Sequence, residues 1–319
     1  MHKVSVGIIG GGGYTAGELL RLLVHHPGVE IKFVVSNSQA GKPIASVHND
    51  LIGDTDLVFV DQPDSAEVIF LCMGHGKSSG WVAEQQPTAE TVIIDLSTDF
   101  RMSEEWVYGL PELNRDATRG AKRIANPGCF ATAIQLAALP LAAAGLIDAP
   151  LHVHAITGSS GAGQNPSPTT HFSWRNNNVS IYKAFRHQHL AEINRSIRQV
   201  DQGREARLHF LPVRGNFARG IYASLYLTTD ADEDLLLDTF ARYFANHPFT
   251  HLTTENPHLK QVVNTNKGLV HVQKIDDQVL VISMIDNLLK GASGQAVQNM
   301  NLAMGLPETM GLQLKAAAL

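Results

Sequence analysis

The sequence predicts an α/β protein with two domains, a parallel-sheet domain followed by an α+β domain with a mixed sheet. The first observation is a β-branched run, Val4–Ile9, that leads through a glycine cluster into the helical stretch 18–23. The second is a series of further apolar runs, each followed by a loop, at 30–35, 68–72 and 91–95. The third is a change of pattern after the helical run that begins at Cys129, where strand-like runs surround one clear helix. A chain of 319 residues is long enough for two hydrophobic cores.

The second half of the chain predicts a mixed sheet. Its strand-like runs lie at 151–156, 207–212, 220–227, 270–275 and 279–285, with a helix over 233–245. The hairpin spacing at Asp276-Asp277-Gln278 makes the last two of these strands antiparallel. A final helical stretch, 295–304, is expected to return to the first domain.

Composition argues against several classes of partner. The formal net charge is -5 and the pI is about 6.3, whereas nucleic acid or an anionic membrane requires a basic surface. Two widely separated cysteines predict no disulfide framework and suit the reducing cytoplasm, and no charged leader precedes Val4. The longest apolar stretch, 131–147, contains Gln135, Pro140 and Gly145, so we expect a pair of core helices and no membrane span.

The glycine cluster after the first strand predicts a Rossmann-type dinucleotide-binding domain. A strand, a glycine turn and a helix N-terminus follow one another directly, and this context lets backbone N–H groups approach a pyrophosphate. A tight turn that needs glycine for local reasons alone is the alternative. The residues expected to bind the cofactor here are Gly10, Gly12, Gly13, Tyr14 and Thr15.

The end of the second strand favours NADP over NAD. An NAD site places an Asp or Glu about twenty residues after the glycine turn, to hold the ribose 2′-hydroxyl. This chain has Ser36, Asn37 and Ser38 there, and neutral side chains accept a 2′-phosphate, with Lys42 as a further candidate. The alternative is an ordinary polar loop.

Loops after the next two strands carry further candidate residues. Because the carboxyl ends of parallel strands gather at one sheet edge, His75 and Ser97 are expected to line the nicotinamide pocket. Arg101 is a candidate for an anion of the substrate. For each residue the alternative is helix capping or contact with solvent.

Cys129 is the candidate nucleophile. It follows the turn Asn126-Pro127-Gly128 and precedes the helical run 130–139, so it falls at a helix N-terminus, where unpaired N–H groups favour a thiolate. The alternative is a small buried apolar residue, which is how we interpret Cys72 in its strand.

The second domain supplies candidate acid–base and anion-binding groups. His187 and His189 lie close together, and a helix beginning there would put Glu192 on the face of His189. A metal site would need a third ligand that the sequence does not identify, so we predict no metal. The small residues 158–164 allow backbone to approach a ligand, and Arg186, Arg214 and Arg219 are cations with a fork of donors for an anion.

A nucleotide domain and a reactive cysteine in one chain predict a definite chemistry. A cysteine holds an acyl group as a thioester and a nicotinamide carries hydride, so together they interconvert an acyl phosphate and an aldehyde. A histidine would manage the protons.

Seven stretches together resemble the N-acetyl-gamma-glutamyl-phosphate reductases, the arginine-biosynthesis relatives of aspartate-semialdehyde dehydrogenase. They are GGGGYTAGELLRLL at 10–23, DLSTDFR at 95–101, YGLPELN at 108–114, ANPGCFAT at 125–132, GSSGAG at 158–163, HQHLAEI at 187–193 and NLLKGASGQAVQNMN at 287–301. They span nearly the whole chain in the family's order.

The resemblance implies NADPH-dependent reduction of N-acetyl-L-glutamyl 5-phosphate to N-acetyl-L-glutamate 5-semialdehyde, in a homotetramer or homodimer with Cys129 as nucleophile. It implies a catalytic histidine in the segment of His187, His189 and Glu192. It also implies a carboxy-terminal helix that packs back onto the cofactor domain. We expect a dinucleotide-binding domain of residues 1–128 and 290–319 and a catalytic and oligomerisation domain of residues 129–289. Cofactor contacts are further expected at Ser160, Gly161 and Asn287, and substrate contacts at Arg101, Asn126, Arg186 and Arg214.

Three segments depart from the family's pattern. Ala16 replaces a glycine, Met73-Gly74 replaces Leu-Pro, and the histidine segment reads HQHLAE where the family has HRHTPE. Alternatives with the same chemistry are N-succinylglutamyl, aminoadipyl or aspartyl phosphate as substrate. An NADP-binding protein without thiol chemistry is a further alternative.

Overall fold

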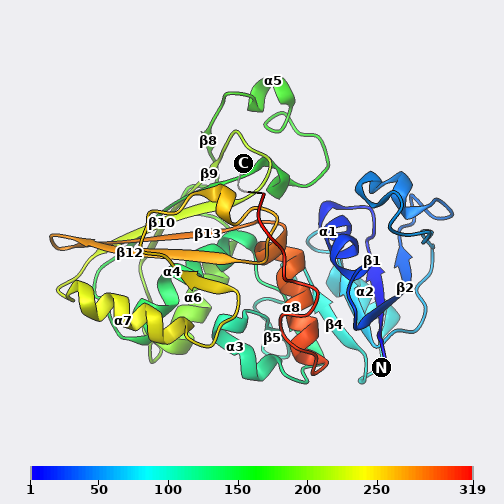
Figure 1. Cartoon of the computed structure of the whole chain (residues 1–319), viewed down its shortest axis with the longest axis horizontal. Helices are drawn as coiled ribbons and strands as arrows, with labels where there is room; N and C mark the ends of the chain where they lie inside the picture. Colours follow the sequence, from blue (N-terminus) through cyan, green and yellow to red (C-terminus); the bar gives the residue numbers. More distant parts are fainter. Residues whose placement is uncertain (1, 318–319) are drawn as a thin grey trace. The chain divides into compact units, whose positions relative to one another are not determined.

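The computed structural model describes residues 2–317, and these form two compact units (Figure 1). The first unit runs to Gly128 and includes Ala292–Gln313; the second comprises Cys129–Gly291 and the last described residues, 314–317. The chain passes from the first unit to the second between Gly128 and Cys129.

The first unit is built on a six-stranded, fully parallel sheet in the order β2-β1-β3-β4-β6-β5. The strands are β1 (Val4–Ile9), β2 (Val29–Val35), β3 (Val68–Leu71), β4 (Val92–Asp95), β5 (Val107–Tyr108) and β6 (Arg123–Ala125). Its helices are α1 (Tyr14–Leu23), α2 (Ser78–Gln85), α3 (Pro111–Thr118) and α8 (Gly294–Ala303), with short 3₁₀ turns η1 (Ile44–Ser46) and η2 (Asn49–Leu51). The central strands β3 and β4 are buried along their whole length, as parallel strands covered on both faces must be.

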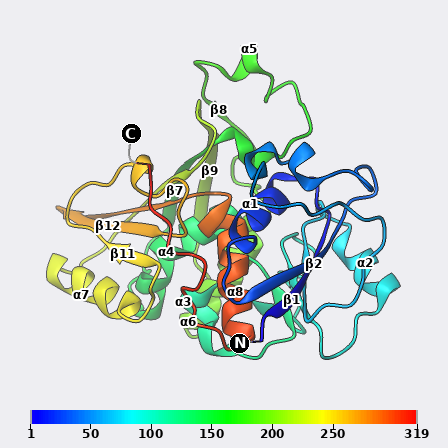
Figure 2. The same ribbon diagram turned by 45° about the vertical axis from the view of Figure 1, so that its right-hand side comes forward.

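The carboxy-terminal helix α8 belongs to the first unit, as Figure 2 shows beside α1. It contacts α1, α3 and β4, and its residues Gly294–Leu302 are buried. The side chain of Ser293 donates a hydrogen bond of 2.7 Å to the carbonyl of Thr15, which joins the start of α8 to the start of α1. A segment distant in sequence thus completes the packing around the glycine turn.

The second unit is built on a seven-stranded mixed sheet in the order β11-β12-β13-β10-β7-β9-β8. The strands are β7 (Leu151–Thr157), β8 (Ser180–Ile181), β9 (Leu208–Arg214), β10 (Ile221–Thr228), β11 (Thr250–Leu252), β12 (Gly268–Ile275) and β13 (Gln278–Ile285). The helices are α4 (Cys129–Ala143), α5 (Phe172–Arg175), α6 (His189–Val200) and α7 (Glu233–Phe244), with η3 (Ser159–Ala162), η4 (Leu259–Gln261) and a π-helix, η5 (Leu289–Ser293). β12 and β13 pair antiparallel, which confirms the predicted hairpin. Both predicted sheet types are therefore present.

Helix α4 forms the centre of the second core. It packs on β10, β12 and β13 and contacts α6 and α7, and every residue from Phe130 to Ala142 is buried. The prediction of two helices was wrong, because Pro140 lies inside one continuous helix. Proline removes one helical hydrogen bond there, and burial of the apolar residues along the helix offsets that loss.

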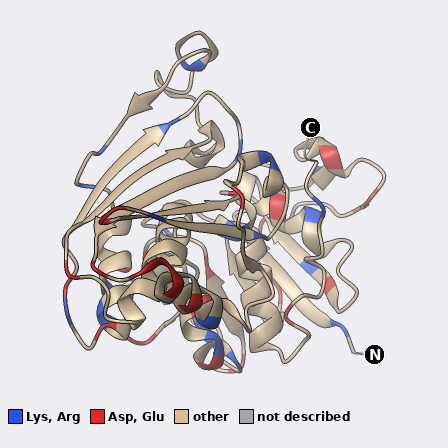
Figure 3. Ribbon diagram, turned by 60° about the vertical axis from the view of Figure 1, so that its left-hand side comes forward, with Lys and Arg blue, Asp and Glu red and all other residues tan. Residues whose placement is uncertain are grey.

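Charged residues of both signs are interspersed along the two units, as Figure 3 shows. No helix within residues 2–317 has both the length and the apolar character needed to cross a lipid bilayer.

Candidate active site

Cys129 is the first residue of α4 and is half-buried, as the turn before it predicts. The helix dipole and the N–H groups of the first turn therefore act on its sulfur and favour the thiolate. Gly291 lies directly against it: a β-carbon added at Gly291 would stand 2.8 Å from Cys129 Cβ and 3.2 Å from its Cα. The glycine is therefore required for the thiol to sit where it does.

Gly291→Ala should lower kcat at least about tenfold, because the added methyl group must displace Cys129 from the start of α4. Affinity for the adenosine half of the cofactor should stay within a few-fold, since the glycine turn lies in the other unit. Steady-state kinetics and a titration with 2′,5′-ADP check this prediction. Unchanged kcat would show that the thiol does not depend on this contact.

The two histidines of the predicted segment meet beside α4. The rings of His187 and His189 have centroids 4.5 Å apart at 75°, and Phe130, the neighbour of Cys129, contacts them edge-on at 5.5 Å and 6.4 Å. His189 is the first residue of α6, and its Nε2 lies 3.9 Å from Oε1 of Glu192. His189 and Glu192 are both buried, which strengthens their electrostatic interaction.

The two histidines have different electrostatic surroundings. Burial, and then the charge of Lys183, lower the pKa of His187 from 6.5 to about 4. Its Nδ1 accepts a hydrogen bond of 3.3 Å from the N–H of His189, so the neutral ring carries its proton on Nε2. His189 instead has the carboxylate of Glu192 beside it, with Oε1 3.9 Å from its Nε2.

The depressed pKa of His187 predicts a loss of stability in acid. Between pH 6.5 and about 4 the unfolded chain binds a proton at this residue while the folded chain does not, so the free energy of unfolding falls as the pH falls. His187→Gln removes that contribution and should lessen the acid loss between pH 7 and pH 4.5 by about 2 kcal/mol. Urea unfolding at pH 7 and pH 4.5 measures it, and parallel curves for the two proteins would contradict it.

Tyr182 is a residue of this site that the sequence did not indicate. Its ring contacts His187 at 5.8 Å between centroids, and the guanidinium carbon of Arg214 lies 4.9 Å from its ring centre. Burial, and then the charge of Cys129, raise the pKa of its hydroxyl. The hydroxyl therefore stays protonated beside the thiolate. An aromatic residue five positions before a histidine carries no signal of its own, which is why sequence analysis missed it.

The structure separates the three candidate arginines of the second unit, of which Arg219 pairs with Asp286. Arg214 ends β9 beside Tyr182, and its Nη1 donates to Oγ1 of Thr169 at 3.2 Å. Arg186 is exposed, and its guanidinium makes no hydrogen bond within residues 2–317. Arg214 is therefore the better placed of the two to meet a substrate near Cys129.

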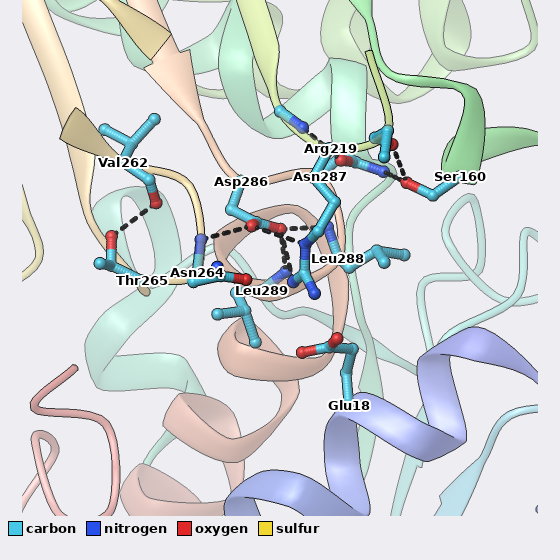
Figure 4. Close-up of polar contacts among 12 residues, drawn as sticks. Glu18, Ser160, Arg219, Val262, Asn264, Thr265, Asp286, Asn287, Leu288 and Leu289 are labelled. Carbon is cyan, nitrogen blue, oxygen red and sulfur yellow. Dashed lines mark hydrogen bonds and ion pairs between the residues drawn. The ribbon is translucent and has the colours of Figure 1, made fainter. Parts of the chain in front are cut away.

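Asn287, Ser160 and Gly161 come together in the second unit, as Figure 4 shows for the first two. Asn287 Nδ2 donates to Ser160 Oγ at 3.0 Å, and its Oδ1 accepts from the N–H of Gly220 at 2.7 Å. An ideal Cβ on Gly161 would lie 3.8 Å from Asn287 Nδ2. Residues from three loops thus form one polar group.

The glycine turn of the first unit has the shape that a dinucleotide requires. Gly10 has a φ of +86°, and a β-carbon there would stand 2.9 Å from the backbone of Cys72, so only glycine fits. A β-carbon added at Gly12 would meet only Ser36 Oγ, at 3.5 Å, and one added at Gly13, directly before α1, would meet nothing within 4 Å. The residues present therefore leave room for a phosphate group over the helix start.

Residues around this turn complete the candidate cofactor site. Tyr14 and Thr15 open α1, Tyr14 is exposed, and Asn37 and Ser38 are exposed just beyond the end of β2. His48, which sequence analysis missed, donates from Nε2 to the carbonyl of Gly11 at 2.7 Å and fixes the turn. Its distance of 37 residues from the glycine gave no sequence signal.

Four predicted residues of the first unit serve its own structure. Ser97 is 1% exposed and donates to Asp95 at 2.7 Å, so its hydroxyl is not open to a cofactor; His75 is exposed and accepts from the N–H of Thr98. Arg101 donates to the carbonyls of Asn126 and Leu96, at 2.9 Å and 3.2 Å. The side-chain amide of Asn126 donates from Nδ2 to the carbonyl of Ala292, and its Oδ1 accepts from Nδ2 of Asn299. Arg101 and Asn126 thereby hold the turn that precedes Cys129, and a role in binding substrate stays a prediction.

Comparison with known proteins agrees with this arrangement. Residues 5–121 match the NAD binding domain of semialdehyde dehydrogenase and residues 129–287 match the semialdehyde dehydrogenase dimerisation domain. The N-acetyl-gamma-glutamyl-phosphate reductase of Parabacteroides distasonis is 55% identical, over 99% of both chains, and that of Christiangramia forsetii is 53% identical over 98% of this chain and 99% of the relative. Aspartate semialdehyde dehydrogenase II of Vibrio cholerae, solved with ASA, shares the fold at a TM-score of 0.75 and 18% identity, over 96% of this chain and 99% of its own. The chain belongs to the semialdehyde dehydrogenases and, within them, to the N-acetyl-gamma-glutamyl-phosphate reductase family.

Proposed function

We propose that this chain reduces N-acetyl-L-glutamyl 5-phosphate to N-acetyl-L-glutamate 5-semialdehyde and phosphate with NADPH, as a step of arginine biosynthesis. The observation that carries the proposal is Cys129 at the first position of α4, with the His189–Glu192 pair packed beside that helix through Phe130. The name shared by the close relatives supports the same substrate.

The thiol performs the first half of the reaction. Cys129 Sγ attacks the acyl carbon of the substrate, and N–H groups at the start of α4 stabilise the tetrahedral oxyanion. The carbon–oxygen bond to phosphate then breaks, phosphate departs with the electron pair, and a thioester remains on Sγ. When bound, NADPH supplies the hydride that reduces the thioester carbon. The resulting oxyanion collapses, the carbon–sulfur bond breaks with its electrons returning to Sγ, and the aldehyde leaves.

We assign different roles to the two histidines. His189 accepts the proton of Sγ and becomes cationic, because Glu192 stabilises that charge, and it returns the proton to the departing phosphate. His187 stays neutral and offers its Nε2–H as a hydrogen-bond donor to the substrate. Arg214, held over Tyr182, binds an anionic group of the substrate, and Arg101, Asn126 and Arg186 remain candidates for further contacts.

NADP(H) binds with its pyrophosphate at the glycine turn formed by Gly10, Gly12, Gly13, Tyr14 and Thr15. Its 2′-phosphate meets Ser36, Asn37 and Ser38. We assign further cofactor contacts to His75, Ser160, Gly161 and Asn287.

Ser38→Asp should weaken NADPH at least about tenfold and leave NADH within about threefold, because the new carboxylate faces the 2′-phosphate. Fluorescence titration of both cofactors with both proteins gives the four dissociation constants. Equal weakening of NADPH and NADH, or equal affinity of the unaltered protein for the two, would sink the assignment of the 2′-phosphate.

The proposal extends to organisation and location. Residues 1–128 and 290–319 act as the dinucleotide-binding domain and residues 129–289 as the catalytic and oligomerisation domain. The protein is a homotetramer or homodimer in the cytoplasm, and the match of residues 129–287 to a dimerisation domain supports self-association. Analytical ultracentrifugation distinguishes the two assemblies.

The substrate is tested in the reverse direction, because the aldehyde is easier to handle than the acyl phosphate. NADP⁺ reduction is followed with phosphate and N-acetylglutamate semialdehyde, in parallel with the N-succinyl, aminoadipate and aspartate semialdehydes. Phosphate-dependent turnover of the N-acetyl compound at the highest kcat/KM is expected. A higher kcat/KM for another semialdehyde would leave the proposed mechanism standing but would show that the N-acetyl compound is not the preferred substrate.

A further inference from the structure

Asp286 is a fully buried carboxylate at the end of β13 that accepts five hydrogen bonds (Figure 4). Arg219 donates to it twice, from Nε to Oδ2 at 3.0 Å and from Nη2 to Oδ1 at 3.1 Å. The N–H of Asn264 donates to Oδ2 at 2.7 Å, and the N–H groups of Leu288 and Leu289 donate to Oδ1 at 2.8 Å and 3.0 Å. Every one of these partners is a donor, so both carboxylate oxygens act as acceptors.

This carboxylate joins three separate loops of the second unit. Arg219 lies between β9 and β10, Asn264 between η4 and β12, and Leu288 and Leu289 between β13 and α8. The backbone carbonyl of Asp286 also accepts from the N–H of Gly291, the glycine that lies against Cys129. Asp286 therefore fixes the segment from the end of β13 to Gly291, the glycine that lies against Cys129.

The next residue, Asn287, bonds to the same loop as Arg219 and also to η3. Its Oδ1 accepts from the N–H of Gly220, the residue that follows Arg219, and its Nδ2 donates to Ser160 Oγ. Ser160 Oγ in turn donates to the carbonyl of Ala218, the residue before Arg219, at 2.6 Å. The ion pair therefore holds residue 219, while Asn287 holds residue 220 directly and residue 218 through Ser160.

We propose that Asp286 and Arg219 are a positioning pair, which fixes the amide of Asn287 in the orientation that receives the nicotinamide end of the cofactor. The inference rests on the proposed function, because that function places Asn287 at the cofactor. Neither Asp286 nor Arg219 touches the reacting atoms in this account, and both act through Asn287 and the backbone at 218–220.

The matched test replaces Asp286 with asparagine, which keeps the shape and turns one acceptor oxygen into a donor facing N–H groups. The exposed Asp276→Asn, in the turn between β12 and β13, is the control. The measured quantity is the ratio of the dissociation constants for NADPH and for 2′,5′-ADP, a fragment that lacks the nicotinamide. Asp286→Asn should raise this ratio at least about tenfold, because NADPH binds more weakly while the dissociation constant for 2′,5′-ADP stays within about twofold. Asp276→Asn should change neither dissociation constant.

A double-mutant cycle separates positioning from general damage. Asn287→Ala should worsen the same ratio, and Asp286→Asn combined with Asn287→Ala should be no worse than Asn287→Ala alone, because both changes remove one function. Arg219→Lys keeps the positive charge but loses the two-pronged guanidinium, so it should raise the ratio less than Asp286→Asn does. If Asp286→Asn does not fold, the ratio in Arg219→Lys is the test. An unchanged ratio in a folded variant, or additive losses in the cycle, would overturn the proposal.

The two proposals fail in distinguishable ways. The double-mutant cycle measures cofactor binding and needs no turnover, so its result can be interpreted even if another semialdehyde proves to be the substrate. A normal ratio in Asn287→Ala overturns the positioning role, whereas absent turnover of every semialdehyde, with the cycle intact, overturns the reaction alone.

Discussion

Cys129→Ser should abolish reduction, with kcat lower by at least about 10⁴-fold, and leave NADPH affinity within a few-fold. The hydroxyl of serine is far less acidic than a thiol, so the helix N-terminus that favours a thiolate yields no comparable nucleophile. Turnover of the acyl phosphate and fluorescence titration of NADPH measure the two quantities. Loss of both together would mean that Cys129 serves the structure instead of the chemistry.

Cys72→Ser is the matched control for that experiment. Burial raises the pKa of the Cys72 thiol to about 12, so this cysteine stays protonated and unreactive at neutral pH. Activity of the variant should remain within a few-fold. A large loss of kcat here would point to a thiol requirement outside the α4 site.

His189→Gln should lower kcat by about 10² to 10⁴-fold, the usual contribution of a general acid–base group. The reason is the neighbouring Glu192, which stabilises the imidazolium that forms when the ring takes the thiol proton. His187→Gln should mainly raise KM, because a neutral donor orients the substrate and does not titrate near pH 7. The pH profiles of kcat and kcat/KM for the two variants measure the split.

The exposed His154→Gln, on β7, is the control for both histidine variants and should retain the activity of the unaltered protein. An equal fall in kcat for His187→Gln and His189→Gln, with the same pH profile, would contradict the division of roles.

Local sequence carried much of the fold because the informative signals were short in range. The run Val4–Ile9, the glycines after it and the start of α1 form one continuous motif, and β1 and α1 appear where that motif places them. The turn before Cys129 likewise predicted the start of α4 from adjacent residues. These elements depend on backbone preferences and on burial of an apolar face, and both are determined by residues close together in the sequence.

Other features depended on partners distant in the chain. Pro140 indicated a break, yet α4 continues because strands and helices bury it along its length. Asp286 meets Arg219 across 67 residues, so the two guanidinium hydrogen bonds form only once β10 and β13 have paired. Tertiary contacts of this range leave no periodic signal in a single sequence.

The most direct test of the account is capture of the thioester. The protein is mixed with N-acetylglutamyl phosphate without NADPH, quenched in acid, and examined by intact mass and by peptide mapping. The account predicts one acyl group per chain, located on Cys129 and absent from Cys72, with one equivalent of phosphate released in a burst. Phosphate release without any acyl adduct, or an adduct elsewhere than Cys129, would contradict it.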